Sequence, residues 1–410
     1  MRVLLVNQFY RPDVAATGQL LADLAEGLVQ RNHEVHVLCS ARAYGGGGSY
    51  AREEAPGGVA VHRVKATGFG RRTSLGRLAD YATFHTLAAW RALRLPAPDV
   101  CVCLTTPPFI AMIGVLLARL RGTRFVLWSM DLYPEVLAAY RMMVPGSWAY
   151  RTLARTSRWL YGKADAVVSL GEVMTERLLA AGVPPGRVYT VHNWVPRETV
   201  QPEPRESCRL RKVLDLRNEV TLLYSGNLGL GHELETAVRA AGRIGGGGDL
   251  RVLFVGDGKM RRPLQELAAS LSLSCVSFHP PQPLEDLSDS LAAGDIHLVS
   301  QQAGTQGLIV PSKLYGSLAA GRPVIFIGPD DCEAGRILGE SQAGIIVPPG
   351  DVDGAARALQ SLVQNAELRG EMGRKARHYY ERNLGRDRSV GQIIAVIEGA
   401  AARRRKGSRQ

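Results

Sequence analysis

The chain has 410 residues, of which 46% are apolar and 21% charged, a composition that is typical of globular proteins and excludes extensive disorder. A single hydrophobic core rarely serves a chain of this length, so we expect two domains. The net charge of +12 is uneven: residues 1–197 hold 23 Lys and Arg against 13 Asp and Glu, whereas residues 198–410 hold 27 against 25. No apolar run is long enough for a transmembrane helix, and the N-terminal run is too short for a signal peptide, so we expect a cytoplasmic protein.

The basic first half, together with the sequence RRRK at 403–406, points to an anionic partner. We expect no nucleic acid, because neither an aromatic stacking pattern nor a nucleic-acid-binding motif accompanies the charge. An anionic membrane surface or a phosphate-bearing substrate fits such a half better, with scattered solvated arginine as the alternative.

The six cysteines are scattered and include no C-x-x-C pair, and no cluster of His, Cys and Asp has the spacing of metal ligands. Cys101 and Cys103 lie in one apolar run, where their close and regular spacing does not suggest a disulfide framework. We therefore expect reduced thiols, no structural metal and no cofactor.

Apolar runs typical of buried strands alternate with helical periodicity from the N-terminus onward. A strand at 2–6 precedes a helix at 18–32 and a strand at 34–40. Further strands are predicted at 59–64, 100–104, 125–130, 166–170 and 188–193. Because the strand runs are apolar on both faces and alternate with helices, they predict a parallel sheet covered by helices.

The same alternation restarts after a segment rich in Pro and charged residues at 196–219. Strands are predicted at 220–226, 251–258, 276–280, 295–300, 323–328 and 343–350. A long helical pattern then runs from Arg369 to Ala402. We predict an α/β protein of two Rossmann-like domains, 1–197 and 198–383, followed at 384–410 by a helix that crosses back to the first domain and a basic tail.

Ligands of open α/β sheets bind beyond the carboxyl ends of the strands, so two such domains facing each other across a cleft would line it with these loops. In the first domain Gly18 opens the helix at 18–32 and lets the backbone approach a ligand, with a plain turn as the alternative. In the second domain YSGNLG and FVGDG each form a glycine turn between a strand and a helix. Gly226, Gly256 and Gly258 would there present backbone N–H groups to a phosphate or a nucleotide.

Two acids follow the strand at 125–130, in the sequence WSMDLYPE. Asp131 and Glu135 are four residues apart, so they could lie near one another, and one of them could act on an acceptor hydroxyl. An ordinary helix cap and a surface acid are the alternatives.

The sequence GLIVPSKLYGSLAAGRPVIF at 307–326 begins with an extended segment at Gly307. It continues with a helix cap at Ser312, a helix of about two turns and a buried strand. Lys313 stands in the first turn of this helix, where positive charge opposes the helix dipole. A cation beside free backbone N–H groups fits a bound anion, and the glycine turns favour a nucleotide diphosphate as that anion.

Seven motifs, in order along nearly the whole chain, resemble those of family 4 glycosyltransferases with the GT-B fold. They are TTPP, DLYPE, SGNLG, VGDG, FHPPQP, DIHLVS and VPSKLYGSLAAGRPVI. The resemblance is to the bacterial branch that builds O-antigen, colanic acid and capsular polysaccharide. It implies metal-independent transfer of an N-acetylated or deoxy hexose from a nucleotide diphosphate donor, most often UDP-linked, with retention at the anomeric carbon. The acceptor would be a hydroxyl of a lipid-linked glycan precursor, and the enzyme would act at the inner face of the membrane.

The resemblance also implies which domain meets which substrate: the second domain holds the donor and the first domain meets the acceptor. Lys313 and residues 226–228 would contact the diphosphate, and Gly18 would let the first domain's loop close over the donor. The base would contact the loop that contains His279, Pro280 and Gln282.

The sequence departs from the family pattern at several of these positions. Family members usually carry an Arg and a Lys for the donor phosphates where this chain has Asn227 and His232. The His that often precedes the first-domain acid is replaced by Met130. Two glutamates, of which the second contacts the ribose, are replaced by Leu308 and Gly316, so Lys313 is the clearest cation left at the diphosphate.

The family chemistry needs no protein nucleophile, because the leaving diphosphate takes the acceptor proton while the protein stabilises its developing charge. Three alternatives stay open. They are a UDP-sugar 2-epimerase of the same fold, a glycosyltransferase with a small-molecule acceptor, and an inactive protein that binds a sugar nucleotide. The segment at 300–316 has few carboxylates, which argues against the epimerase.

Overall fold

The computed structural model describes residues 1–44, 48–69, 74–196, 200–244 and 248–407, without the side chains of Ser74 and of residues 404–407. The chain forms two compact units: unit 1 comprises Met1–His192 and Asp387–Gln410, and unit 2 comprises Asn193–Arg386. Both are α/β units built on largely parallel sheets, which confirms the predicted class of fold. The predicted boundary at 197 and most of the RRRK side chains lie outside the described residues, so both stay predictions.

Unit 1 contains an eight-stranded sheet in the order β3-β4-β2-β1-β5-β6-β7-β8. The strands are β1 (Arg2–Val6), β2 (Glu34–Ser40), β3 (Glu53–Glu54), β4 (Val59–Val64), β5 (Val100–Cys103), β6 (Arg124–Trp128), β7 (Ala166–Ser169) and β8 (Val188–Thr190). All neighbouring pairs are parallel except β3 and β4. The edge strand β3 is absent from the predicted strands, because two residues are too few to show an alternation.

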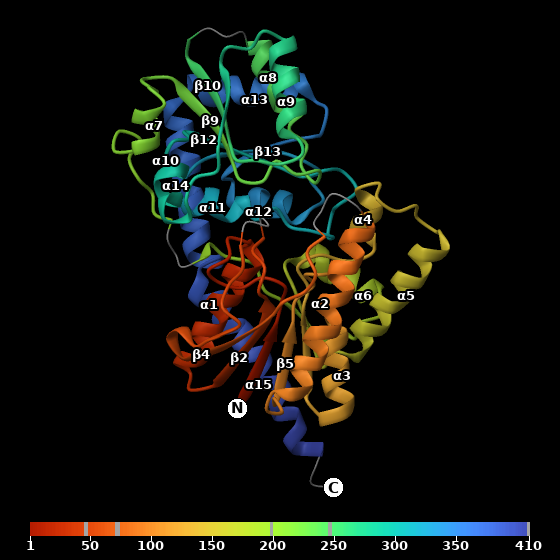
Figure 1. Cartoon of the computed structure of the whole chain (residues 1–410). Helices are drawn as coiled ribbons and strands as arrows, with labels where there is room; N and C mark the ends of the chain where they lie inside the picture. Colours follow the sequence, from red (N-terminus) through yellow and green to blue (C-terminus); the bar gives the residue numbers. More distant parts are fainter. Residues whose placement is uncertain (45–47, 70–73, 197–199, 245–247, 408–410) are drawn as a thin grey trace. The chain divides into compact units, whose positions relative to one another are not determined.

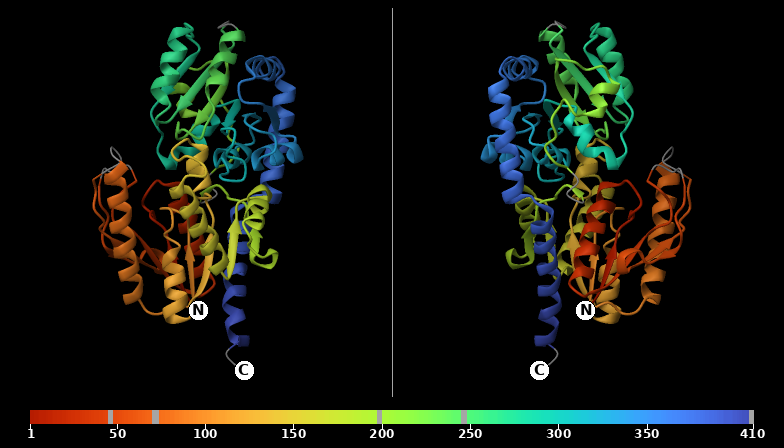
Figure 2. Two further views of the ribbon diagram at one scale, coloured as in Figure 1. Left: turned by 90° about the vertical axis from the view of Figure 1, so that its right-hand side faces the viewer. Right: turned by 90° about the vertical axis from the view of Figure 1, so that its left-hand side faces the viewer.

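Helices cover both faces of this sheet (Figure 1). They are α1 (Ala16–Gln30), α2 (Ser74–Arg94), α3 (Met112–Arg121), α4 (Glu135–Ala139), α5 (Trp148–Lys163), α6 (Glu172–Ala180) and α15 (Arg386–Gly407), with short 3-10 turns at Pro56–Gly58 and Pro185–Arg187. In Figure 2, α2 lies on one side of the sheet and α15 on the other. The ring Nε2 of His33 lies 3.0 Å from Glu398 Oε1, and Ile393 and Ile397 are fully buried, so α15 is an integral part of unit 1.

The helical pattern predicted from Arg369 to Ala402 is divided in the structure, and its second part corresponds to the helix predicted at 384–410. The structure has two helices there, α14 (Ala366–Asn383) and α15, separated at Leu384 and Gly385. Leu384 is fully buried in the core of unit 2. The helical run ends at this anchor and at the glycine that follows it, just before the chain passes into unit 1.

Unit 2 contains a six-stranded parallel sheet in the order β11-β10-β9-β12-β13-β14. The strands are β9 (Val220–Ser225), β10 (Leu250–Val255), β11 (Val276–His279), β12 (Ile296–Ser300), β13 (Val324–Ile327) and β14 (Gly344–Val347). The remaining helices are α7 (Arg209–Val213), α8 (Glu235–Ile244), α9 (Arg261–Ser270), α10 (Leu287–Ala292), α11 (Lys313–Ala319), α12 (Glu333–Ser341) and α13 (Val352–Gln364), with a 3-10 turn at Leu284–Asp286. One core forms under α8, α9 and α13, and a second forms under α10, α11, α12 and α14.

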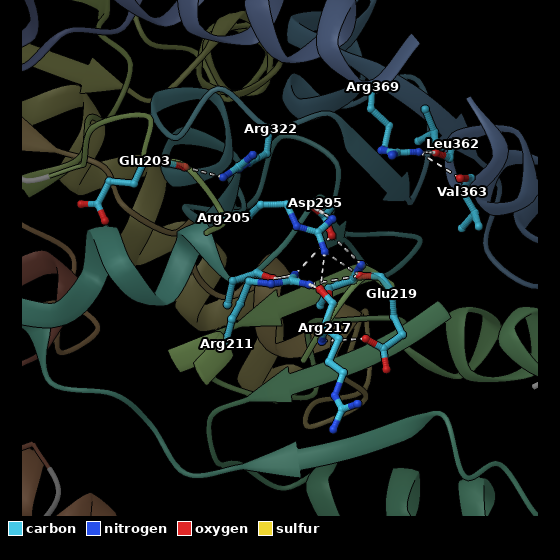
Figure 3. A network of polar contacts seen from close by, with 12 residues as sticks. Glu203, Arg205, Arg211, Arg217, Glu219, Asp295, Arg322, Leu362, Val363 and Arg369 are labelled. Carbon is cyan, nitrogen blue, oxygen red and sulfur yellow. Dashed lines mark hydrogen bonds and ion pairs between the residues drawn. The ribbon is translucent and has the colours of Figure 1, made fainter. Parts of the chain in front are cut away.

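The charged segment before β9 is fastened to unit 2 by a buried ionic network around Asp295 (Figure 3). Asp295 accepts hydrogen bonds from Arg205 at 3.0 Å, from Arg211 at 3.3 Å and from the backbone N–H of Thr221 at 2.9 Å. Arg211 is only 3% exposed and also donates to three backbone carbonyls and to the Thr221 hydroxyl. This segment therefore belongs to the fold of unit 2.

Candidate active site

Lys313 is the first residue of α11, but the predicted cap at Ser312 is wrong. Ser312 has helical backbone angles, φ −59° and ψ −23°, and its hydroxyl forms no capping hydrogen bond. A capping side chain reaches the first-turn amides from an extended backbone. The amides of Leu314 and Tyr315 bond instead to the carbonyls of Pro311 and Ser312, at 3.1 and 3.2 Å. These first-turn amides are therefore already bonded, and the group that α11 offers to a ligand is the Lys313 side chain.

The ammonium of Lys313 is held by three neighbours, none of which is an acid. It lies 3.2 Å from Nε2 of His232 and 3.4 Å from the carbonyl oxygen of Asn227. It also lies over the ring of Tyr224, 4.8 Å from the ring centroid, where the aromatic face attracts a cation. No ion pair in the described part of the chain involves Lys313. Its charge is therefore positioned but not neutralised.

His232 is held as a neutral ring with a defined proton position. Its Nδ1 lies 2.9 Å from the carbonyl oxygen of Ser300, so Nδ1 carries the proton and Nε2 presents a lone pair to Lys313. Burial, and then the nearby Lys313 charge, lowers the pKa of His232 to about 3. Burial lowers the pKa of Lys313 to about 8. At neutral pH the pair is a charged lysine that donates to a neutral histidine.

The glycine turns after β9 and β10 do not offer their amides to a ligand as predicted. Gly226 N–H donates to the carbonyl of Val255 at 2.8 Å, and Gly256 N–H donates to that of His279 at 2.9 Å. Gly258 N–H bonds the side chain of the residue before it at 2.8 Å. These amides tie neighbouring strand ends together, so the phosphate cradle expected from the motifs is occupied by the chain's own hydrogen bonds.

Gly226 has a different use, which is to let the Lys313 side chain pass. Its φ is +125°, and a Cβ atom there would lie 2.8 Å from Cε of Lys313. A side chain at 226 would displace the lysine stem, since real Cβ atoms do not approach carbon so closely. The SGNLG motif therefore positions the Lys313 ammonium.

The residues predicted to contact the base lie where β11 ends. The carbonyl of His279 accepts a hydrogen bond from Arg261 at 3.1 Å, its ring Nε2 lies 3.0 Å from Ser277 Oγ, and burial lowers its pKa. Pro280 is exposed, and Gln282 donates to the Pro280 carbonyl at 3.1 Å. The loop has a defined shape with an exposed tip, and its contact with a base stays a prediction.

The two positions at which the sequence lacks the expected glutamates differ in burial. Leu308 is 3% exposed and Gly307 is also buried, so little of either side chain or backbone is open to a donor. Gly316 is partly exposed, and the nearest atom to a Cβ there would be Leu291 Cδ1 at 3.5 Å. Packing therefore does not require a glycine at 316.

In unit 1, Asp131 lies in the loop that leaves β6. The hydroxyl of Thr105 accepts hydrogen bonds from the backbone N–H groups of Met130 and Asp131, both at 3.1 Å. Burial raises the pKa of Asp131 to about 6, and a hydrogen bond from the Tyr133 hydroxyl opposes that shift. Glu135 begins α4 and is partly exposed. A carboxyl with a pKa near 6 can exchange a proton near neutral pH.

Gly18 does not open α1, which begins two residues earlier at Ala16. It is buried, its N–H donates to the carbonyl of Ala15 at 2.9 Å, and a Cβ there would lie 3.1 Å from backbone atoms of Phe9 and Tyr10. The loop that the sequence predicted would approach a ligand packs on the helix itself. The prediction that Gly18 opens the helix is therefore wrong, and its approach to a donor stays a prediction.

Sequence reasoning missed four residues that organise these sites: Tyr224, Ser300, Thr105 and Tyr133. Each lies in or beside a motif that was recognised, at the carboxyl end of a predicted strand. Their position at strand ends is a usable signal. The contact partners of these four residues could not be predicted from the sequence, because each partner is remote in the chain or lies on the far side of a turn.

Among the described residues, no group of three or more His, Cys, Asp or Glu side chains is placed to hold a metal ion. All six cysteines are buried free thiols. No helix in the described ranges is both long and apolar enough to cross a membrane.

Comparison with known proteins identifies the class. The model of a glycosyl transferase 4-like domain matches residues 16–194, and that of glycosyl transferases group 1 matches residues 219–365. WcaI of Escherichia coli, whose name places it in colanic acid biosynthesis, is 28% identical over 97% of this chain and 100% of its own length. The glycosyltransferase WbjE of Pseudomonas aeruginosa is 28% identical over 65% of this chain and 66% of its own length.

Among solved structures, Anabaena HepE in complex with UDP-glucose superposes with a TM-score of 0.72 at 14% identity, over 97% of this chain and 100% of that one. Two parallel-sheet units, the domain matches and these neighbours define a glycosyltransferase of the GT-B fold. The chain belongs to glycosyltransferase family 4, in the branch that includes WcaI.

Proposed function

We propose that this glycosyltransferase transfers a hexose, N-acetylated or deoxygenated, from a UDP-linked donor with retention at the anomeric carbon and without a metal ion. The observation that carries the proposal is the Lys313 ammonium, which is fixed by His232 and Asn227 yet lacks an acidic partner in the described residues. A diphosphate supplies the missing negative charge. That Anabaena HepE was solved with UDP-glucose supports a UDP-linked donor.

In this proposal the donor diphosphate lies against Lys313 in unit 2. Negative charge develops on the β-phosphate as the bond to the sugar breaks, and a preorganised ammonium stabilises that charge without reorganisation. The leaving phosphate takes the proton of the acceptor hydroxyl on the same face of the sugar, which gives retention. His279, Pro280 and Gln282 contact the base, and Gly316 leaves the ribose without the usual carboxylate.

Unit 1 receives the acceptor, and Asp131 assists its hydroxyl. With a pKa of about 6, Asp131 is mostly ionised at neutral pH and can accept a hydrogen bond from a hydroxyl. Glu135 is the second acidic candidate in that loop. The acceptor is a lipid-linked glycan precursor of a surface polysaccharide, a proposal supported by the biosynthetic name of WcaI.

We further propose that unit 1 associates with an anionic membrane surface. Exposed apolar side chains occur on three of its helices, including Leu78 on α2, Leu120 on α3 and Trp148 on α5, which is 81% exposed. Arginines accompany them, as where the Arg119 guanidinium lies 5.8 Å from the Trp159 ring centroid. Aromatic and basic side chains together favour a lipid interface.

The test is a thermal-shift panel of nucleoside diphosphates and their sugars, followed by release of free nucleotide with and without an acceptor. Stabilisation by UDP and its sugars, with UDP release only when a glycan acceptor is present, is the expected result. Release without acceptor and conversion of the free sugar nucleotide would indicate an epimerase. Binding without turnover against lipid-linked and small acceptors would indicate an inactive binder, and preference for another nucleotide would overturn the UDP assignment.

A further inference from the structure

A pocket of about 290 Å³ lies at the β3 edge of the unit 1 sheet, between β4 and the second half of α2. Four cationic side chains line it, with one carboxylate, and its remaining wall is apolar. None of its lining residues belongs to the loops that hold Asp131 or Gly18. The pocket is therefore separate from the candidate active site.

Two of the four cations are already neutralised within the protein. Arg63 is 4% exposed, pairs with Glu54 and donates to the backbone carbonyl of Ala51 at 3.0 Å. Arg91 pairs with Glu53 across the mouth of the pocket. These two guanidiniums build the walls and contribute no surplus charge.

Arg91 is also hydrogen-bonded to the first of two linked histidines, His62 and His36. It donates to Nδ1 of His62 at 3.1 Å, so His62 carries its proton on Nε2, which lies 3.0 Å from Nδ1 of His36. His36 in turn donates through Nε2 to Glu34 at 3.0 Å. Burial, and next the Arg91 charge, lowers the pKa of His62, in keeping with a neutral ring. The pocket wall is thus preorganised.

The other two cations, Arg52 and Lys65, are exposed and are in no ion pair within the described part of the chain. They face a pocket whose apolar wall includes Leu87 and Trp90, which is 52% exposed. The guanidinium of Arg94 lies 3.8 Å from the Trp90 ring centroid and adds a further charge beside the pocket. An anion with an apolar part fits this surface, because its charge would meet the two unpaired cations and its apolar part would cover the exposed tryptophan ring.

We propose that this pocket binds the phosphate group of an organic phosphate, with Arg52 and Lys65 as its cations and Trp90 and Leu87 against the organic part. A phosphate fits two unpaired cations because it carries up to two negative charges and accepts hydrogen bonds in several directions. The pocket volume of about 290 Å³ holds a phosphate with a glycerol or a sugar ring attached. The phosphate comes from a phospholipid headgroup or from a soluble phosphorylated compound.

The experiment measures binding to the full chain with two probes. Glycerol 3-phosphate is titrated against tryptophan fluorescence, with Trp90→Phe to show that the signal arises at this pocket. Vesicles of phosphatidylglycerol, with phosphatidylcholine for comparison, are tested by co-sedimentation. The test variant is the double change Arg52→Ala with Lys65→Ala, which removes only exposed side chains and so should not disturb folding.

A matched control changes Arg177→Ala and Arg187→Ala, which are also exposed in unit 1 but flank β8 at the opposite edge of the sheet. The proposal expects saturable binding that the pocket double variant weakens about tenfold or more and the control leaves within about twofold. Loss of glycerol 3-phosphate binding identifies a soluble ligand site, and loss of vesicle binding alone identifies a headgroup site. Failure of both probes to bind the wild type, or equal loss in the control, would overturn it. Transfer from a sugar nucleotide to a soluble acceptor is measured separately, so the proposed function is tested independently of this pocket.

Discussion

Unit 2 contains two cations with opposite surroundings, the buried Arg211 and the partly buried Lys313. Burial lowers the pKa of both. Arg211 donates to the carboxylate of Asp295, at 3.3 Å, and to backbone carbonyls and a hydroxyl around it. Lys313 meets only a neutral histidine, a carbonyl oxygen and an aromatic ring.

A structural cation and a cation that serves a ligand therefore differ in the charge of their partners. A buried charge with a carboxylate and a full set of acceptors has its desolvation offset within the fold. A partly buried charge held by neutral groups, such as Lys313, keeps a desolvation cost that an anionic ligand relieves, and such costs are typical of functional sites. A lowered pKa alone does not separate the two cases, but the charge of the partner does.

The largest effect should come from removing Asp295, the carboxylate partner of the structural cation Arg211. Asp295→Ala leaves Arg205 and Arg211 without their carboxylate in a buried place, and we expect a loss of about 3–5 kcal/mol in the free energy of unfolding of unit 2. Urea denaturation measures it. Arg262→Ala, which breaks the exposed pair with Glu266, is the matched control and should change stability little. A small effect of Asp295→Ala would remove the distinction between the two cations.

Lys313→Ala should lower turnover of the donor by a factor of about a hundred or more, because it removes the charge that stabilises the leaving diphosphate. Initial rates of UDP release in the presence of acceptor measure the change. The far-ultraviolet circular dichroism spectrum should match that of the wild type. The melting temperature should equal or exceed the wild-type value. Activity within about threefold of the wild type would exclude the diphosphate role.

His232→Phe should weaken UDP binding by about tenfold, because Lys313 loses the Nε2 acceptor that positions its ammonium. Isothermal titration of UDP gives the dissociation constant. His232→Gln supplies an amide oxygen at a similar reach and should recover part of the affinity. If the phenylalanine and glutamine variants bind UDP equally well, His232 does not position the lysine.

UDP affinity should fall as pH rises through about 8, the pKa to which burial brings Lys313. The sign follows from the charge: the ammonium is present below that pKa and is lost above it, while His232, with a pKa of about 3, stays neutral throughout. Because a bound diphosphate favours the ammonium, binding near pH 8 should take up protons. Calorimetry in buffers of different ionisation enthalpy detects this uptake, which Lys313→Arg should abolish.

A further effect should be a gain in stability. Lys313→Met removes a cation whose pKa lies below its ordinary value of 10.5, so the charged form destabilises the folded state at neutral pH. The variant should melt at a higher temperature than the wild type at pH 7. This difference should shrink between about pH 8 and pH 10.5, as the wild-type lysine loses its proton. A lower melting temperature at pH 7 would show that Lys313 is a structural cation like Arg211.

Apart from the antiparallel edge strand β3, the strands of both units were predictable because parallel strands are buried on both faces and appear as short apolar runs. β9, for example, occupies Val220–Ser225 where a strand was predicted at 220–226. Helix ends were less predictable, because the contacts that decide them are remote in sequence. The start of α1 before Gly18 and the break at Leu384 both depend on packing that no local pattern reveals.

For the candidate site, Lys313 was recognisable as a cation out of place at a helix start. Its partner was not: the resemblance assigned His232 to the donor phosphates, whereas the structure turns its Nε2 to Lys313. The glycine turns were recognised too, but their amides are used between adjacent strand ends. Candidate functional residues can be identified from a sequence, whereas the contacts between them are set by the tertiary structure.

The place of α15 bears on the order in which the protein folds during synthesis. Unit 2 is one continuous stretch, Asn193–Arg386, whereas unit 1 is completed only by a helix that follows it. Ile393 and Ile397 of that helix are fully buried, so the nascent first unit lacks part of its interior until all of unit 2 has left the ribosome. Unit 2 can therefore reach its native state first, although its residues are translated second.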